Sequence, residues 1–371
     1  MKVARRVAAV AVAGGLMLLA ACGSGSSDQA APGAGGTKKI TVAIAAAVLG
    51  PKEEVAVISV GKQMGYYAQE GIDVETINAD GSVAAVQAVA SGSADITPGD
   101  TGSLLAGVQK NVPITVIGGL VQNWPWQIAT LPTSTIKSAA DLKGKKVGVI
   151  SLASGSAPFA RAVIRSGGLE PDRDVELIPV GVGAQAAAAI NSGAVDALAL
   201  YGQAYTVLEL SGTKLAYIPN TDQFQGIRSL SFAAASSKLT ADKDLYGKFL
   251  RASYKALLFS AANPKAAMTM GYQVYPQILA GQTADQRITN DTASLTAWIK
   301  SATPATGQPA DWKNWGAISD ADWAKTQTYT QGAGQITAPI ALNKVWDPSL
   351  LTEANNFDSA AVLAQAAKGQ P

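Results

Sequence analysis

A repeated alternation of short β-branched runs with helical stretches begins near Lys39 and constrains the fold more than any other feature of this chain. The runs expected to form strands are 40–44, 73–77, 94–97 and 114–121, and the helices expected between them are 53–69, 83–90 and 101–110. Ser82 is expected to cap the second helix, and Gly71 and Gly92 to end the first two. Such an alternation predicts a mostly parallel sheet covered by helices on both faces.

The alternation starts again after Trp124-Pro125-Trp126. This second series is expected to contain strands at 146–150, 175–180, 196–200 and 230–234, a helix that follows Ser154-Gly155-Ser156 and ends at Arg165, and a helix at 184–191. Beyond 239 nearly everything has helical spacing, first at 239–261 and then after Asn263-Pro264. A chain of 371 residues with 48% hydrophobic and 15% charged residues fits two α/β domains, and bulk disorder is excluded.

The N-terminus has the pattern of a secretory signal. Three basic residues precede an uncharged apolar run at 7–21, which is shorter than the roughly 20 residues that a spanning helix needs. The run ends in Leu19-Ala20-Ala21-Cys22, which resembles the bacterial lipobox and contains the only Cys. We therefore expect a signal peptide at 1–21, a lipid-modified Cys22 and a flexible tether at 22–38, with the folded part held outside the cell membrane.

Composition excludes several classes of function. With 29 Lys+Arg against 27 Asp+Glu, the chain lacks the basic excess of a nucleic-acid-binding protein. It contains no His, which removes imidazole bases and imidazole metal ligands, and one Cys cannot form an intrachain disulfide. We predict no metal, no cofactor and no nucleic-acid partner.

An enzyme is the first alternative, because Ser-x-x-Lys occurs three times, at Ser59, Ser134 and Ser211. No Ser-Asp-Asn or Lys-Thr-Gly accompanies these matches, and the chain has no Gly-x-Ser-x-Gly and no phosphate-binding glycine motif. We expect no catalytic residues.

Several segments resemble the substrate-binding proteins of ABC importers for sulfonates, taurine, nitrate and thiamin pyrimidines, the NMT1/THI5-like family. Gly65–Glu75 resembles the family's G-F-F-x-x-E-G-L-D-V-E, and Asp141–Val149 resembles D-L-K-G-K-K-V-G-V. Shorter similarities occur at Gln87–Ile96, Gly99-Asp100-Thr101 and Ile190–Ala197. Each match alone is weak, but their order and spacing over roughly 40–259 make the resemblance strong.

The resemblance implies a type II periplasmic-binding-protein fold of two α/β lobes, joined by two hinge strands, with a ligand cleft between them. Lobe I would comprise 39–124 and 228–371, and lobe II 125–227, with crossovers near 123–127 and 226–232. The C-terminal helices would pack on lobe I. It also implies a small-molecule ligand, a permease and an ATPase as partners, and a monomer; a receptor that signals instead of transporting remains an alternative.

Candidate ligand contacts follow from the rule that open α/β sheets bind at the carboxyl ends of their strands. They are Ser82, Asp100, Thr101, Trp126, Ser154, Gly155, Ser156, Tyr201 and Gln203. Three of the loops combine Gly with hydroxyls before a helix, which suits a small anion bound without Arg. A sulfonate or carboxylate, aromatic ones included, is the expected ligand, and a heteroaromatic ring of the thiamin-pyrimidine kind is the alternative.

Asp100 and Trp126 each have a second interpretation. Asp100 does not suit an anion, and it could cap its own helix or pair with Arg161 or a ligand amine. Trp124 and Trp126 could form an aromatic wall of the site or simply pack at the hinge. Tyr201 stands where many members of the family have a W-D-P-like segment, so the ligand is less certain than the fold.

Overall fold

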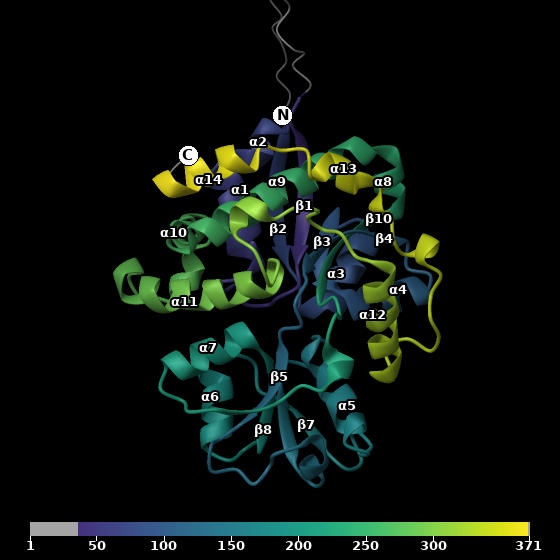
Figure 1. Cartoon of the computed structure of the whole chain (residues 1–371), viewed down its shortest axis with the longest axis vertical. Coiled ribbons are helices and arrows are strands. Elements are labelled where there is room, and N and C mark those ends of the chain that lie inside the picture. Colours follow the sequence, from purple (N-terminus) through teal and green to yellow (C-terminus); the bar gives the residue numbers. More distant parts are fainter. Residues whose placement is uncertain (1–35, 370–371) are drawn as a thin grey trace, which may run out of the picture. The chain divides into compact units, whose positions relative to one another are not determined.

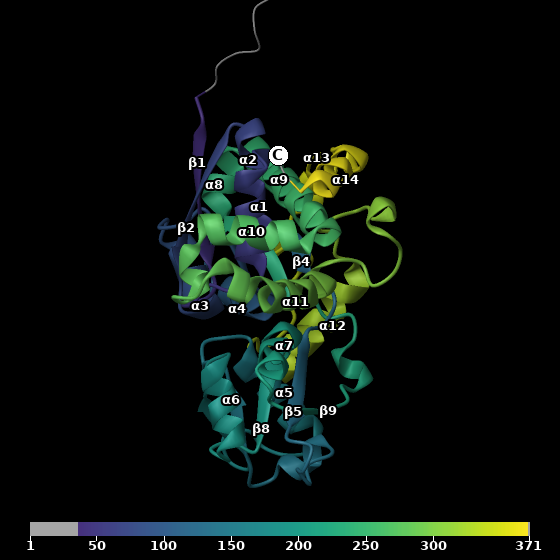
Figure 2. The ribbon, with the colours of Figure 1, turned by 90° about the vertical axis from the view of Figure 1, so that its left-hand side faces the viewer.

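The computed structural model describes residues 36–369, which form two five-stranded sheets with helices packed around them (Figures 1 and 2). The predicted signal peptide at 1–21, Cys22 and most of the tether lie outside the described residues. No helix among residues 36–369 is long and apolar enough to cross a membrane.

The first sheet has the strand order β2-β1-β3-β10-β4. Its strands are β1 (Lys38–Ile44), β2 (Ile72–Asn78), β3 (Ile96–Asp100), β4 (Ile114–Val121) and β10 (Leu230–Ala235). β1 runs parallel to β2 and β3, and β10 runs antiparallel to β3 and β4, with Ser231 opposite Gly99. The strands predicted for this sheet are confirmed, and the returning strand β10 is the one that breaks the parallel pattern.

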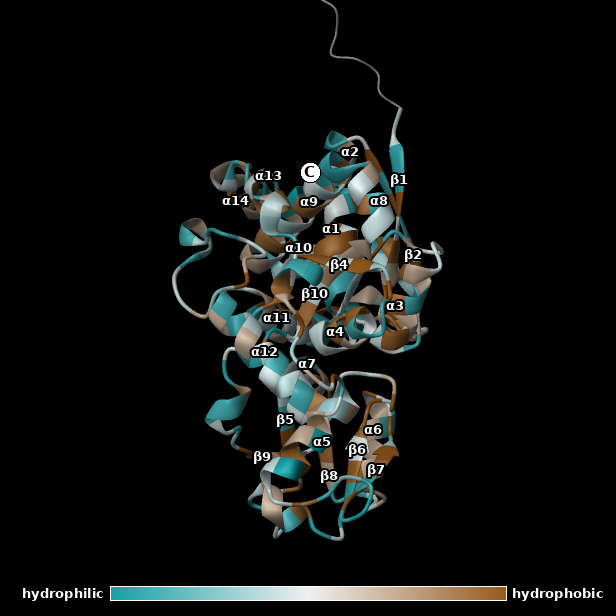
Figure 3. Ribbon diagram, turned by 90° about the vertical axis from the view of Figure 1, so that its right-hand side faces the viewer, coloured by the Kyte–Doolittle hydropathy of each residue, from teal (hydrophilic) through white to brown (hydrophobic). Residues whose placement is uncertain are grey.

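The second sheet has the order β7-β6-β8-β5-β9. Its strands are β5 (Trp126–Thr130), β6 (Lys146–Val149), β7 (Glu176–Pro179), β8 (Ala197–Tyr201) and β9 (Ala216–Ile218). β6 is parallel to β7 and β8, and β5 is antiparallel to β8 and β9. β5 and β9 were not predicted, because one follows the proline of Trp124-Pro125-Trp126 and the other has only three residues. In Figure 3 strands such as β4 and β8 are mostly hydrophobic, in keeping with their burial.

The chain passes between the sheets twice. It leaves the first sheet at Val121 and enters the second at Trp126, and it returns between Ile218 and Leu230. These are the two predicted crossovers. The lobe boundaries at 124/125 and 227/228 remain a prediction; below, the first half means the first sheet with the helices packed on it, and the second half means the second sheet with its helices.

Helices surround both sheets (Figure 1). They are α3 (Gly81–Ala90), α4 (Thr101–Gln109), α5 (Ser156–Ser166), α6 (Ala184–Asn191), α7 (Gly202–Leu210), α8 (Ser236–Ala241), α9 (Lys243–Ala262), α10 (Pro264–Val274), α11 (Ala284–Ala302), α12 (Asp320–Gly332), α13 (Leu351–Ala354) and α14 (Ser359–Lys368). α9 and α10 share the core of β1 and β2, as the predicted packing of C-terminal helices on lobe I requires. The Asn263 side chain accepts from the Ala266 N–H at 3.0 Å and caps α10, so the predicted break at Asn263-Pro264 is confirmed.

The single helix predicted at 53–69 is wrong. The segment consists of a π-helical stretch, Glu54–Ser59, followed by two short helices, α1 (Val60–Gln63) and α2 (Tyr66–Gln69). Gly65 separates the last two, because its φ of 69° is incompatible with a continuing helix. All six residues of the π-helical stretch are buried, and Ser260 donates to the Ala56 carbonyl at 2.7 Å. Stretches of π-helix are uncommon and are often found at functional sites.

Candidate ligand-binding cavity

A cavity of about 540 Å³ lies where the loops of the two halves meet. It is lined by the loops that follow β1, β2, β3, β6, β7 and β8, together with the crossover strands and α11. The carboxyl ends of these strands therefore surround the cavity, as the rule for open α/β sheets leads us to expect. Its volume is within the range of about 300–1,000 Å³ typical of small-molecule sites.

Seven of the nine predicted contact residues line this cavity. They are Ser82, Asp100, Trp126, Ser154, Gly155, Tyr201 and Gln203. Their contact with a ligand remains a prediction. Four helices, α3, α5, α6 and α7, begin at the cavity, so the positive ends of their dipoles lie at its edge.

Thr101 and Ser156 are not among the lining residues, and both are fully buried. The Thr101 hydroxyl is hydrogen-bonded to Ser231 Oγ at 2.9 Å. Ser156 Oγ donates to the Ala199 carbonyl at 2.6 Å and accepts from the Ile150 N–H at 3.0 Å. These hydroxyls hold the cavity loops on their strands, which makes them positioning residues.

Ser82 has a different role from the predicted one. The cap position of α3 is occupied by Asp80, and Ser82 Oγ accepts from the Asp100 N–H at 2.9 Å. The predicted N-cap is therefore wrong, and the serine instead joins the start of α3 to the end of β3.

Asp100 caps α4, which confirms one of its alternatives. Its Oδ2 accepts from the N–H and the hydroxyl of Ser103, at 2.8 and 3.0 Å, and from Gln335 Nε2 at 3.4 Å. Arg161 pairs with Asp172 at 3.3 Å and not with Asp100. Burial raises the pKa of Asp100, with the three hydrogen bonds acting against it. A Cβ on Gly155 would lie 3.2 Å from Asp100 Oδ1, so the second half approaches this carboxyl closely.

The two tryptophans lie in different places: Trp126 lines the cavity, where its contact with a ligand remains a prediction, and Trp124 packs at the crossover. Trp126 packs edge-to-face on Tyr201 with ring centroids 5.4 Å apart, and its Nε1 donates to Ser229 Oγ at 3.1 Å, in the cavity wall. Trp124 packs instead on Tyr329 and Phe224 at the crossover, outside the cavity. Burial raises the pKa of Tyr201 to about 12, so it is a neutral ring at physiological pH.

The charged cluster Lys52-Glu53-Glu54 was not predicted. Glu53 and Glu54 are buried, and Lys52 and Glu53 line the cavity. Lys52 Nζ is 2.7 Å from Glu53 Oε1 and 2.7 Å from Glu54 Oε2, and Glu54 also accepts from the Gly50 N–H. Burial raises the pKa of Glu54 to about 7, against the opposing effect of Lys52. Burial acts to lower the pKa of Lys52, but the two carboxylates outweigh it and the amine stays charged. Three consecutive charges look like the start of a solvated helix, so the sequence offers no signal for this burial.

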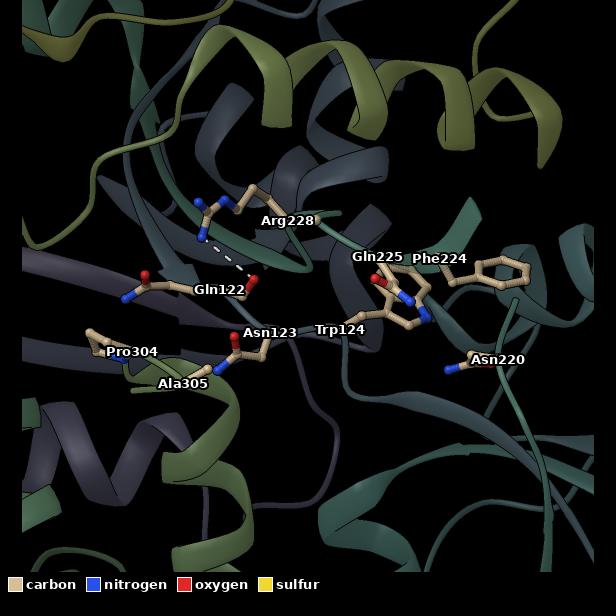
Figure 4. Close-up of a pocket in the computed structure, with 10 residues that line it drawn as sticks. Gln122, Asn123, Trp124, Asn220, Phe224, Gln225, Arg228, Pro304 and Ala305 are labelled. Atoms are coloured by element: carbon tan, nitrogen blue, oxygen red, sulfur yellow. Dashed lines mark hydrogen bonds between the residues drawn. The ribbon is translucent and has the colours of Figure 1, made fainter. Parts of the chain in front are cut away.

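A second hollow of about 490 Å³ lies at the crossover (Figure 4). Figure 4 shows Trp124 and Arg228 beside it, with the Arg228 guanidinium directed to the Gln122 carbonyl at 3.5 Å. Asp322 already neutralises this arginine at 2.6 Å. The hollow is lined by the two crossover segments and by the residues after α11, whereas the larger cavity lies among the helix starts of both halves and has the features of a binding site.

Two sheets joined by two crossovers, with a cavity at the carboxyl ends of their strands, define a periplasmic-binding-protein fold. The alkanesulfonate-binding protein SsuA from Xanthomonas axonopodis pv. citri, solved with bound MOPS, shares it, with a TM-score of 0.60 and 16% identity over 84% of this chain and 99% of that one.

The family model described as NMT1/THI5 like matches residues 52–267, and the chain belongs to this family. The riboflavin-binding protein RibY of Chloroflexus aurantiacus is 25% identical over 299 residues, 80% of this chain and 82% of RibY. The formylaminopyrimidine-binding protein of Halalkalibacterium halodurans is 24% identical over 215 residues, 56% of this chain and 62% of the relative.

Proposed function

We propose that this protein is the extracytoplasmic substrate-binding component of an ABC importer and that its ligand is a flat heteroaromatic molecule without net negative charge. The sequence favoured a sulfonate or carboxylate and left a heteroaromatic ring as the alternative; we now choose the ring. The charge of the cavity lining is the observation that carries the choice.

The lining contains one basic residue and three acidic ones. The basic residue is Lys52, and it already forms ion pairs with Glu53 and Glu54. The acidic ones are Glu53, Asp80 and Asp100, and no arginine lines the cavity. An anion would therefore meet carboxylates without a free cation to offset them.

The size of the effect decides between the classes. At an effective dielectric constant near 20, two like charges 4–6 Å apart repel by roughly 3–4 kcal/mol. That repulsion is equivalent to about 100- to 1,000-fold in affinity. The N-termini of α3, α5, α6 and α7 offer partial positive charge, but each helix end typically contributes only about 0.3–1 kcal/mol. They suit the carbonyl groups of a neutral ring better than a full negative charge.

The rest of the cavity suits such a ring. Trp126 and Tyr201 supply aromatic surface from the second half, and Trp298 of α11 supplies it from the first. The two relatives described above have names that specify a flavin and a pyrimidine, both flat rings with N–H and carbonyl groups.

The wider setting follows from the same proposal. Cys22 would carry the lipid anchor after removal of 1–21, and the monomer would deliver its ligand to a permease and an ATPase. Ligand contact with both halves would stabilise the form that the permease recognises. We propose a carrier and not an enzyme, because the chain has no His and its Ser-x-x-Lys segments do not line the cavity.

A thermal-shift screen tests the proposed ligand class. Riboflavin, aminopyrimidine and uracil represent neutral rings, and taurine, alkyl and aryl sulfonates, phthalate and nitrate represent anions. A ligand present at about 100 times its Kd adds roughly 2.7 kcal/mol to the free energy of unfolding, which raises Tm by several degrees. We expect at least one neutral ring to do so. A rise with the anions alone would contradict the proposal.

A further inference from the structure

Two buried side-chain oxygens at the cavity have no hydrogen-bond partner: Glu53 Oε2 and Gln203 Oε1. The other buried polar side-chain atoms without partners in residues 36–369 all belong to residues outside the lining of this cavity. Buried polar groups in folded proteins are nearly always paired, so two unpaired acceptors in one cavity require an explanation.

The remaining polar atom of each side chain is held in place. Glu53 Oε1 is bound by Lys52 Nζ at 2.7 Å, and Gln203 Nε2 donates to Ser294 Oγ at 2.8 Å. Glu53 is 4% exposed and Gln203 7% exposed, so neither side chain can turn its free oxygen to solvent. With these bonds in place, Oε2 of Glu53 and Oε1 of Gln203 are the acceptor atoms left without a partner.

These acceptors come from different halves of the protein. Glu53 directly precedes the π-helical stretch of the first half, and Gln203 lies in the first turn of α7 in the second. The bond from Gln203 to Ser294 on α11 already joins the halves beside the cavity. A ligand that satisfied both oxygens would add a second connection between the two halves, from α7 to the segment that precedes the π-helical stretch.

We propose, on the basis of the function proposed above, that Glu53 and Gln203 form an acceptor pair that selects ligands with two hydrogen-bond donors. One ligand N–H or O–H donates to Glu53 Oε2, and another donates to Gln203 Oε1. Imide, amino and amide groups on a ring supply such donors. A ring of the same shape without donors leaves both oxygens buried and unpaired, and it loses affinity for that reason.

Methylated probe pairs test the pair of acceptors by isothermal titration calorimetry. The pairs are uracil and dimethyluracil, aminopyrimidine and dimethylaminopyrimidine, and riboflavin and its N-methylated imide. We expect the donor-bearing member of a binding pair to bind roughly 10- to 100-fold more tightly than the methylated one. Equal affinity within the pairs overturns the acceptor pair and leaves the proposed function standing.

The matched variants are Glu53→Gln and Glu54→Gln. Both remove a carboxylate that pairs with Lys52, but only Glu53 lines the cavity. We expect Glu53→Gln to lower the affinity for the donor-bearing ring at least 10-fold and to leave the methylated ring unaffected, with little change in Glu54→Gln. Equal losses in the two variants overturn the assignment to Glu53. Binding of anions with no binding of any ring contradicts the proposed function itself, as does no binding of any probe.

Discussion

The two walls of the cavity differ in charge. All four charged lining residues, Lys52, Glu53, Asp80 and Asp100, come from the first half. The second half contributes apolar, hydroxyl, amide and aromatic groups and no charge, including Ser154, Tyr201 and Gln203. Under the proposed function, discrimination by charge would reside on the first wall, and the second wall would supply Trp126 and Tyr201 to the ring opposite Trp298 of the first.

The largest effect is expected where the two walls meet, at Gly81. A Cβ on Gly81 would lie 2.9 Å from the Ala153 carbonyl of the second half, and its φ of 80° also disfavours any other residue. We expect Gly81→Ala to separate the walls and to lower ring affinity by about 100-fold, because both halves must contact the ligand together. Calorimetry with the tightest-binding ring of the screen measures this loss.

Gly92→Ala is the control for Gly81→Ala. Gly92 also has a φ of 80°, but nothing lies within 4 Å of its Cβ position. The Gly92→Ala variant should lose about 1–2 kcal/mol of stability through backbone strain and keep its affinity for the ring. Equal losses of affinity in both variants would show that contact between the walls is unimportant.

The ring wall is tested by Trp126→Leu against Trp124→Leu. Both variants remove a tryptophan near the crossover and should lower Tm. Only Trp126 lines the cavity, so only its loss should weaken ring binding, by roughly 10- to 50-fold. Calorimetry on both variants measures this difference, and a comparable effect of Trp124→Leu would contradict the division between cavity wall and crossover packing.

The Lys52-Glu53-Glu54 cluster behind the charged wall predicts a dependence of stability on pH. The pKa of Glu54 is raised from 4.5 to about 7, so the folded state binds its proton more tightly than the unfolded chain does. The resulting contribution to stability is fully present below pH 4.5 and is lost as the pH rises through about 7. Urea unfolding between pH 4.5 and 8 should show a decline on the order of 1–3 kcal/mol from this group. The decline should be smaller in Glu54→Gln, and an unchanged profile in that variant would contradict the assignment.

The smallest effects are expected from two neighbouring serines at the start of α5, of which Ser154 lines the cavity and Ser156 does not. Ser156→Ala removes a fully buried hydroxyl with two hydrogen bonds and should cost about 1–3 kcal/mol of stability. Ser154→Ala removes a partly buried hydroxyl that bonds to the Ser151 carbonyl at 2.9 Å, in the lining. It should change ring affinity only a few-fold and leave Tm nearly unchanged. A reversed pattern in calorimetry and thermal melts would contradict the different positions of the two side chains.

The sequence predicted the first sheet, the parallel strands of the second and the segments at the strand ends, because all three follow from local patterns. β1 and β4 are β-branched runs, and ligand loops follow strand ends. The sequence could not predict the partners of individual side chains. The Ser156 hydroxyl donates to the carbonyl of Ala199, which is 43 residues away in the sequence. Trp298 lines the cavity from a C-terminal helix. Burial of Glu53 depends on the packing of a π-helical stretch, which hydrophobic periodicity does not reveal.

The central claim is that the cavity rejects negative charge, and a charge-matched pair of ligands tests it most directly. The measurement is the Kd, by calorimetry at pH 7, of the tightest neutral ring and of the same ring carrying a carboxylate, as in uracil and orotate. We predict that the neutral ring binds at least about 100-fold more tightly. Equal or tighter binding of the carboxylate would contradict the claim.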